Sequence, residues 1–223
     1  GPHSWQASRR AADAGLAAAD AVLEGERAAY ALCRPAGHHT TADIAAGHCM
    51  MNVSAIAAAR LRTVHDRVAV LDIDTHHGNG TQGIFYDRAD VLTVSIHTDP
   101  ANYYPFYTGY ADETGAGAGA GYNLNIPLPQ TTTDEAWLAS VAQGLDRVRD
   151  FAPGAMVLAL GLDQHEDDPL KGMKVTWDGL AKAGDMIAEA GLPTAIVQEG
   201  GYLSDGLTTS LVRFLSGFLG RSA

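Results

Sequence analysis

One segment of the chain constrains its fold more than any other, because an apolar, β-branched run ends there abruptly in carboxylates and imidazoles. The segment reads Val70-Leu-Asp-Ile-Asp-Thr-His-His-Gly-Asn-Gly80. Side chains alternate along a strand, so Asp74 and His76 would leave the same face and could bind one ion together. In open α/β folds, ligands bind just beyond the carboxyl ends of the strands, which is where these residues would lie.

The composition predicts a folded α/β protein. Apolar residues make up 46% of the 223 residues, charged residues make up 18%, and there are 25 glycines. These values exclude a disordered chain and a coiled coil. The length suits one domain that buries roughly 70% of its unfolded surface, so we expect residues 1–223 to form a single domain.

The charge restricts the class of partner. With 15 basic and 26 acidic residues, the formal net charge is -11, which argues against a nucleic-acid backbone or an anionic membrane as the main partner. A cationic substrate would be attracted, although the acidity could simply keep the protein in solution. Cys33 and Cys49 form no spaced framework, and we find neither a signal peptide nor a membrane-spanning run, so we expect a reduced cytoplasm.

Apolar runs alternate with amphipathic ones, as strands and helices do in a parallel sheet. Strands are expected near Ala29–Cys33, Arg67–Ile73, Val91–Ile96, Tyr122–Ile126, Ala155–Leu160 and Thr194–Val197. Helices are expected around Trp5–Leu23, Val53–Val64, Glu135–Phe151, Trp177–Ala190 and Gly206–Phe218.

Two of these helices carry end signals. Thr132 and Glu135 have the spacing of a capping box ahead of the third helix. The fourth helix is expected to begin after an N-cap at Thr176 and to stop at Gly191, because Pro193 prevents its continuation.

Polar residues gather where four of the predicted strands end, and packing alone does not explain this pattern. A lone Asp at a strand end is often a helix cap, and a single His-His pair is weak evidence of a site. The occurrence of such residues after four strands is strong evidence of a site. The four segments are Arg34-Pro-Ala-Gly-His-His39, Asp74 with His76, Gly161-Leu-Asp-Gln-His-Glu-Asp-Asp-Pro169, and Glu199-Gly-Gly-Tyr202.

Taken together, these motifs resemble the zinc-dependent histone deacetylases and acetylpolyamine amidohydrolases of the arginase-like fold, from about Trp5 to about Phe218. Within that family the chain looks closest to the bacterial acetylpolyamine amidohydrolases. The resemblance implies a three-layer α/β/α fold with a mostly parallel sheet. The further motifs that carry it are Asp72-Ile-Asp-Thr-His-His-Gly-Asn-Gly-Thr-Gln82, Val94-Ser-Ile-His-Thr-Asp-Pro100, Asn123-Leu-Asn-Ile-Pro-Leu-Pro129, Asp168-Pro169, Ala31-Leu-Cys-Arg-Pro35 and Gly109-Tyr-Ala-Asp-Glu-Thr-Gly115.

The resemblance implies that Asp74, His76 and Asp163 are zinc ligands, with Fe²⁺ as an alternative metal. Three protein ligands are typical of catalytic zinc, which keeps coordination open for water and substrate, whereas structural zinc is closed by four. The implied reaction is hydrolysis of an acetylated amine, such as an acetylpolyamine or acetyl-lysine, to acetate and free amine.

The resemblance also implies three catalytic side chains. His38 is expected to face Asp72, and His39 to face Asn79, partners that would hold the tautomer and basicity of each imidazole. Tyr202 is expected to hydrogen-bond the scissile carbonyl oxygen opposite the metal.

A monovalent cation, K⁺, is implied near Asp72, Asp74, Ser95 and the backbone of His76 and Ile96. For Asp72, the alternative is that it serves only as the partner of His38. A narrow substrate tunnel is implied as well, walled by His48 and Tyr104. The histidine departs from the aromatic ring usual there, and a polar wall could suit a polar or cationic substrate.

Two other functions stay open. His165 could reach the ligand face and support an arginase-like site with two metals, although Gly78 stands where the arginase pattern has an Asp. The chain could also be an inactive fragment that binds acetylated ligands or a partner, because the family's N-terminal region has no counterpart before Trp5. That would leave an exposed sheet edge beside the strand leading into His38, which invites pairing into a homo-oligomer.

Overall fold

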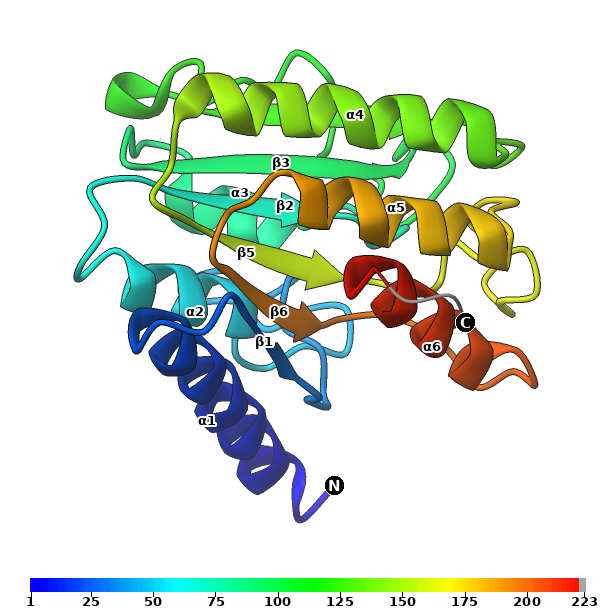
Figure 1. Cartoon of the computed structure of the whole chain (residues 1–223), viewed down its shortest axis with the longest axis horizontal. Coiled ribbons are helices and arrows are strands. Elements are labelled where there is room, and N and C mark those ends of the chain that lie inside the picture. Colours follow the sequence, from blue (N-terminus) through cyan, green and yellow to red (C-terminus); the bar gives the residue numbers. More distant parts are fainter. Residues whose placement is uncertain (221–223) are drawn as a thin grey trace.

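The centre of the structure is a six-stranded sheet in which every strand pair is parallel (Figure 1). The computed structural model describes residues 1–220. The strands are β1 (Ala28–Ala31), β2 (Val68–Asp72), β3 (Val91–Thr98), β4 (Asn123–Leu128), β5 (Ala155–Leu160) and β6 (Thr194–Gln198). Their order is β1-β6-β5-β2-β3-β4, which makes β1 an edge strand, as expected from the sequence.

Helices cover both faces of the sheet, so the predicted three-layer α/β/α architecture is confirmed. The helices are α1 (Ser4–Leu23), α2 (Val53–Leu61), α3 (Asn79–Phe85), α4 (Asp134–Phe151), α5 (Trp177–Glu189) and α6 (Leu207–Phe218), with a short 3-10 helix η1 (Gly117–Gly119). None of the helices in residues 1–220 combines the length and apolar character that a membrane crossing requires.

Each face of the sheet has its own core, because side chains alternate along the strands. On one face, Leu71 of β2 lies in a cluster with Trp137 of α4 and Phe214 of α6. On the other, Val70 lies in a cluster with Leu61 of α2 and residues of α1. Successive residues of β2 therefore face opposite layers, which explains why the strand reads as an unbroken apolar run.

The sequence predicted each strand, but it missed α3. The segment that forms α3, Asn79-Gly-Thr-Gln-Gly-Ile-Phe85, is rich in residues of low helix propensity, and this hides it from a sequence pattern. The helix is nevertheless held at its start, where the N–H groups of Gly80 and Thr81 donate to the carbonyl oxygen of His38.

The predicted capping box of α4 is wrong. The N-cap is Thr133, one residue later, and no side chain caps this end of the helix. A parallel bridge to Lys174, whose N–H donates to the carbonyl oxygen of Thr132 at 2.8 Å, keeps the backbone extended up to Thr133. The prediction for α5 is confirmed. Thr176 accepts from the N–H of Gly179, and Gly191 follows the helix in the left-handed conformation at φ 70°.

Because every strand runs the same way, all carboxyl ends lie at one edge of the sheet, toward the right in Figure 1. The loops that follow β1, β2, β5 and β6 carry the four polar segments found in the sequence. The fold therefore brings segments that are far apart in the chain to one place.

Candidate metal and catalytic site

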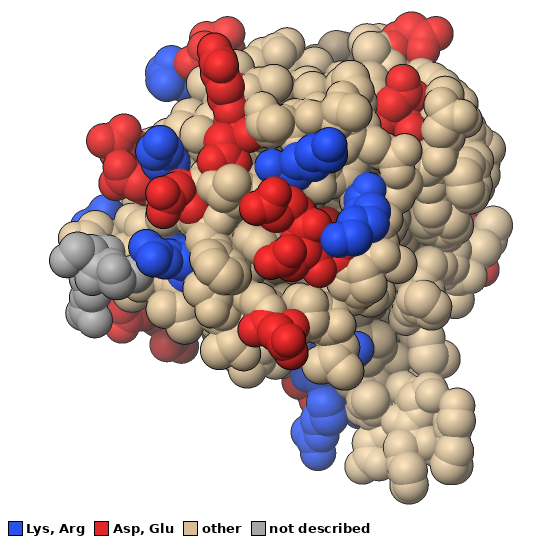
Figure 2. Space-filling model, turned by 90° about the vertical axis from the view of Figure 1, so that its right-hand side faces the viewer, with Lys and Arg blue, Asp and Glu red and all other residues tan. Residues whose placement is uncertain are grey.

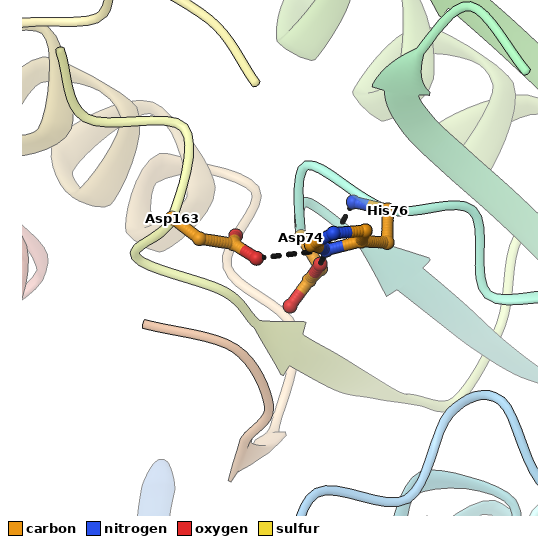
Figure 3. Close-up of side chains that lie close together, drawn as sticks. All are labelled: Asp74, His76 and Asp163. Atoms are coloured by element: carbon orange, nitrogen blue, oxygen red, sulfur yellow. Dashed lines mark hydrogen bonds and ion pairs between the residues drawn. The ribbon is translucent and has the colours of Figure 1, made fainter. Parts of the chain in front are cut away.

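Three side chains converge beyond the ends of β2 and β5 (Figure 3). These strands are neighbours, so Asp74 and His76, which follow β2, come close to Asp163, which follows β5. His76 Nδ1 lies 3.0 Å from Asp74 Oδ1 and 2.9 Å from Asp163 Oδ2. All three residues are buried, and one ligand atom from each lies within 4.8 Å of the other two.

Backbone groups hold the two carboxylates in place. Asp74 Oδ2 accepts from the N–H of Gly200 at 2.7 Å, and Asp163 Oδ1 accepts from the N–H of Thr75 at 3.0 Å. The backbone of Gly200 passes so close that a Cβ there would lie 2.9 Å from Asp163 Cγ and nearer still to one carboxylate oxygen of each aspartate. Only glycine fits at this position, as is typical where the backbone must approach a site closely.

The donor set suits a divalent cation. Burial raises the pKa of Asp163 to about 7, and the charge of nearby Asp74 adds to the shift. Within residues 1–220, the salt bridges of these two carboxylates involve histidines and no lysine or arginine. Two buried carboxylates and an imidazole around one point are ligands that Zn²⁺ or Fe²⁺ accepts.

The His38–His39 pair lies beside the three converging side chains. His38 Nδ1 is 2.9 Å from Asp72 Oδ2, and His39 Nδ1 is 2.6 Å from Asn79 Oδ1. The ring centroids of the two histidines are 4.1 Å apart, and that of His39 is 5.8 Å from that of His76. The structure thus brings together the residues that the sequence paired.

The two imidazoles have opposite electrostatic environments. Burial lowers the pKa of His38, but the carboxylates of Asp72 and Asp74 outweigh it and hold that pKa well above its usual value. Burial lowers the pKa of His39 well below its usual value, and the neighbouring His38 lowers it further. A carboxylate behind one ring and an amide behind the other account for this asymmetry.

A cavity of about 520 Å³ leads to the site. The proposed ligand His76 lines this cavity together with His39 and Tyr202. The two residues expected in a tunnel wall, His48 and Tyr104, line it as well. The ring centroid of Tyr202 lies 6.2 Å from that of His76, and that of Tyr104 lies 4.9 Å from that of His39, edge to face. His48 is exposed and adopts the left-handed conformation, with φ 65°.

Other predicted residues lie outside this group. His165 stacks on Trp177, with ring centroids 5.1 Å apart, and its Nδ1 accepts from the N–H of Asp167. It does not join the ligand cluster, which is the single group of this spacing within residues 1–220. Ser95, expected near K⁺, is the register partner of Asp72 on the adjacent strand, and its hydroxyl lies 2.9 Å from His97 Nδ1.

Two residues at the site went unnoticed in the sequence. Tyr103 stacks on the ring of His76, with centroids 4.9 Å apart and planes 26° apart. Glu199 is buried, and its Oε2 accepts from the N–H groups of Gly37 and His38 at 2.6 and 3.1 Å. The sequence could have pointed to Tyr103, because it directly precedes the expected wall residue Tyr104. It could have pointed to Glu199 as well, because this residue begins the motif that ends at Tyr202.

Comparisons with known proteins identify the family of the chain. Residues 1–218 match the histone deacetylase domain. The chain is 51% identical over 218 residues to an acetylpolyamine amidohydrolase of Burkholderia pseudomallei and 40% identical over 220 residues to one of Mycoplana ramosa. These alignments cover 98% of this chain and 64% of each relative, so the chain spans about two thirds of their length.

Solved structures give the same result. A crystal structure of acetylpolyamine aminohydrolase from Burkholderia pseudomallei matches with a TM-score of 0.94 at 51% identity, over 97% of this chain and 63% of that one. The HD domain of HDA15 matches with a TM-score of 0.90 at 32% identity, over the same shares of the two chains. The chain therefore belongs to the histone deacetylase family.

Proposed function

We propose that this site hydrolyses the amide bond of an acetylated amine, releasing acetate and the free amine. The observation that carries the proposal is the convergence of Asp74, His76 and Asp163 beside a histidine pair and a tyrosine, at the end of one cavity. The similarity to proteins named acetylpolyamine amidohydrolase supports the same reaction.

Asp74, His76 and Asp163 would hold one Zn²⁺, with Fe²⁺ as the alternative. When bound, the metal would polarise the acetyl carbonyl and lower the pKa of a water molecule. Three protein ligands leave coordination positions open for both. The burial of the two aspartates favours binding, because a divalent cation would neutralise carboxylates that, within residues 1–220, have only histidines and no lysine or arginine as salt-bridge partners.

The chain's own residues would move the protons. His39 is the proposed base that accepts the proton of the attacking water, since it lines the cavity and its other ring nitrogen is fixed by Asn79. A histidine of the pair would then protonate the leaving amine. The phenol of Tyr202, on the same cavity wall, would donate a hydrogen bond to the oxyanion.

The proposed substrate is a small acetylated amine of the acetylpolyamine type, with acetyl-lysine as the alternative. Aromatic side chains in the cavity wall, Tyr104 and Phe106, would pack against an alkyl chain. Figure 2, which views the molecule from the side toward which the strands point, shows both acidic and basic side chains near the middle of this face. The net charge of -11 favours a cationic substrate.

Three further parts of the proposal concern a monovalent cation, the compartment and self-association. K⁺ near Asp72 and Ser95 is supported by the side-by-side register of these residues at the ends of β2 and β3. A reducing cytoplasm is supported by the free, buried thiols of Cys33 and Cys49. Pairing of two copies along the edge strand β1 is testable by light scattering.

Metal analysis combined with substrate assays tests the proposed function. One zinc per chain, with acetate released from acetylputrescine, acetylspermidine or an acetyl-lysine peptide, is the expected result. Two metals per chain and urea release from arginine would instead indicate a dinuclear hydrolase, an alternative that the position of His165 does not favour. Bound metal without any turnover would indicate a binding protein and overturn the proposal.

A further inference from the structure

Asp168 belongs to a motif that the proposed mechanism does not use. It lies in the loop after β5, five residues beyond Asp163, and it is only 3% exposed. Its Oδ1 accepts from the N–H of Leu170 at 2.9 Å, and its Oδ2 accepts from the N–H of Tyr202 at 3.0 Å. One carboxylate therefore joins the loop after β5 to the loop after β6.

Both residues that donate to Asp168 line the cavity that contains the site. The carbonyl oxygen of Leu170 accepts from the hydroxyl of Tyr103 at 3.1 Å, and the ring of Tyr103 stacks on His76. A continuous series of contacts thus runs from the ligand His76, through Tyr103, Leu170 and Asp168, to the backbone of Tyr202.

The segment around Tyr202 has few other restraints. It follows Gly201, whose φ of 129° is accessible mainly to glycine, and it precedes Leu203, which is 94% exposed. Within the described residues, the N–H of Tyr202 is the one backbone donor between residues 201 and 206 that has an acceptor. The Asp168 carboxylate is accordingly what fixes the backbone from which the phenol extends.

The two N–H groups that donate to residue 168 require a side chain with two acceptor oxygens, which a carboxylate provides. Within residues 1–220 Asp168 forms no salt bridge with a lysine or arginine, and its burial is compensated by the two N–H groups that donate to it. An asparagine could accept with one oxygen only, and its NH₂ group would face a second N–H donor. Either Leu170 or Tyr202 would then lose its acceptor.

We propose that Asp168 is a positioning residue, which sets the place of the Tyr202 phenol in the cavity. The proposal rests on the proposed function, in which Tyr202 donates to the oxyanion. A displacement of about 1 Å at a reacting group can cost about 100-fold in rate. Loss of the tether should therefore act on turnover and leave metal binding intact.

A double-mutant cycle separates this role from a general structural one. We expect Asp168→Ala to lower kcat by about 10- to 100-fold, with zinc content unchanged, and to change kcat less than threefold in a Tyr202→Phe background. The matched control is Asp167→Ala, which removes a carboxylate from the exposed neighbouring residue and should leave kcat within twofold. Equal losses in both backgrounds would overturn the proposal, as would an unchanged kcat in the single variant.

Hydrogen–deuterium exchange provides a readout that does not depend on activity. In Asp168→Ala, which removes both acceptors, the amide of Tyr202 should exchange at least tenfold faster than in the unmodified chain, while amides of the segment from Asp74 to His76 keep their rates. Unchanged exchange at Tyr202 would refute the tether even if the chain hydrolyses no amide. Absent hydrolysis with the expected exchange would instead refute the proposed function and leave the tether intact.

Discussion

Gly200 offers a sharp test of the metal site, because its backbone touches both proposed carboxylate ligands. Its N–H donates to Asp74 Oδ2 at 2.7 Å. In Gly200→Ala, the new Cβ would lie 2.9 Å from Asp163 Cγ, whereas ordinary contacts of a Cβ begin at 3.4 Å. The backbone or the carboxylate would have to move by at least about half an ångström to relieve this overlap.

That movement exceeds what a metal site tolerates. Ligand distances must stay within about 0.2 Å of their preferred values, and loss of a single supporting contact around the ligands costs about 10- to 100-fold in affinity. Because Gly200→Ala disturbs two ligands at once, we expect zinc affinity to fall by about 100-fold or more, which is ~3 kcal/mol of binding free energy.

Competition titration of Zn²⁺ against a chromophoric chelator measures this affinity. Gly83→Ala is the matched control: Gly83 is exposed in α3, and the atom nearest to a Cβ there would be Thr41 Cγ2, at an ordinary contact distance of 3.7 Å. That variant should bind zinc within twofold of the unmodified chain and gain about 0.4–1 kcal/mol of stability. A Gly200→Ala variant with unreduced affinity would refute the assignment of Asp74 and Asp163 as ligands.

Substitutions at three other positions test separate parts of the account. Tyr202→Phe should lower turnover by about 100- to 1000-fold with zinc content unchanged, and undiminished turnover would remove Tyr202 from the mechanism. Glu199→Ala leaves the buried N–H groups of Gly37 and His38 without their acceptor and should cost about 2–4 kcal/mol in urea unfolding. Burial raises the pKa of Glu199, so the unmodified chain loses stability as pH rises toward that pKa and the buried carboxyl must ionise. The free energy of unfolding of Glu199→Gln should therefore increase relative to that of the unmodified chain from pH 4 to pH 7. A difference that stays flat or falls over this range would contradict this. Phe214→Ala, at a fully buried position of α6, which packs against α5, should cost about 3–5 kcal/mol, and a loss below about 1 kcal/mol would contradict the described packing.

The sequence predicts the elements of this fold well where they are buried. The strand around Val70 is recognisable because both of its faces pack against helices, so nearly every residue is apolar. Helix α3 is not recognisable, because its start is held by the carbonyl oxygen of His38 and not by its own glycine-rich sequence. The start of α4 at Thr133 depends on the pairing of Thr132 with Lys174, a contact that no local pattern reports.

The sequence singles out side chains that the structure brings together, but it does not reveal their backbone partners. Asp74 and His76 reveal themselves by their spacing after a strand, because the alternation of a strand sends both to one face. Asp168 and Glu199 act on the N–H groups of Tyr202, Gly37 and His38, and every residue except proline carries such a group. Their roles become visible only when the loops after β1, β5 and β6 are seen together.

The most direct test of the central claim is a crystal structure of the zinc-loaded chain with anomalous scattering recorded at the zinc edge. We expect one strong peak about 2.0–2.2 Å from an oxygen of Asp74, a nitrogen of His76 and an oxygen of Asp163. A zinc peak bound elsewhere, or no peak after soaking at saturating zinc, would contradict the claim that these three residues form the metal centre.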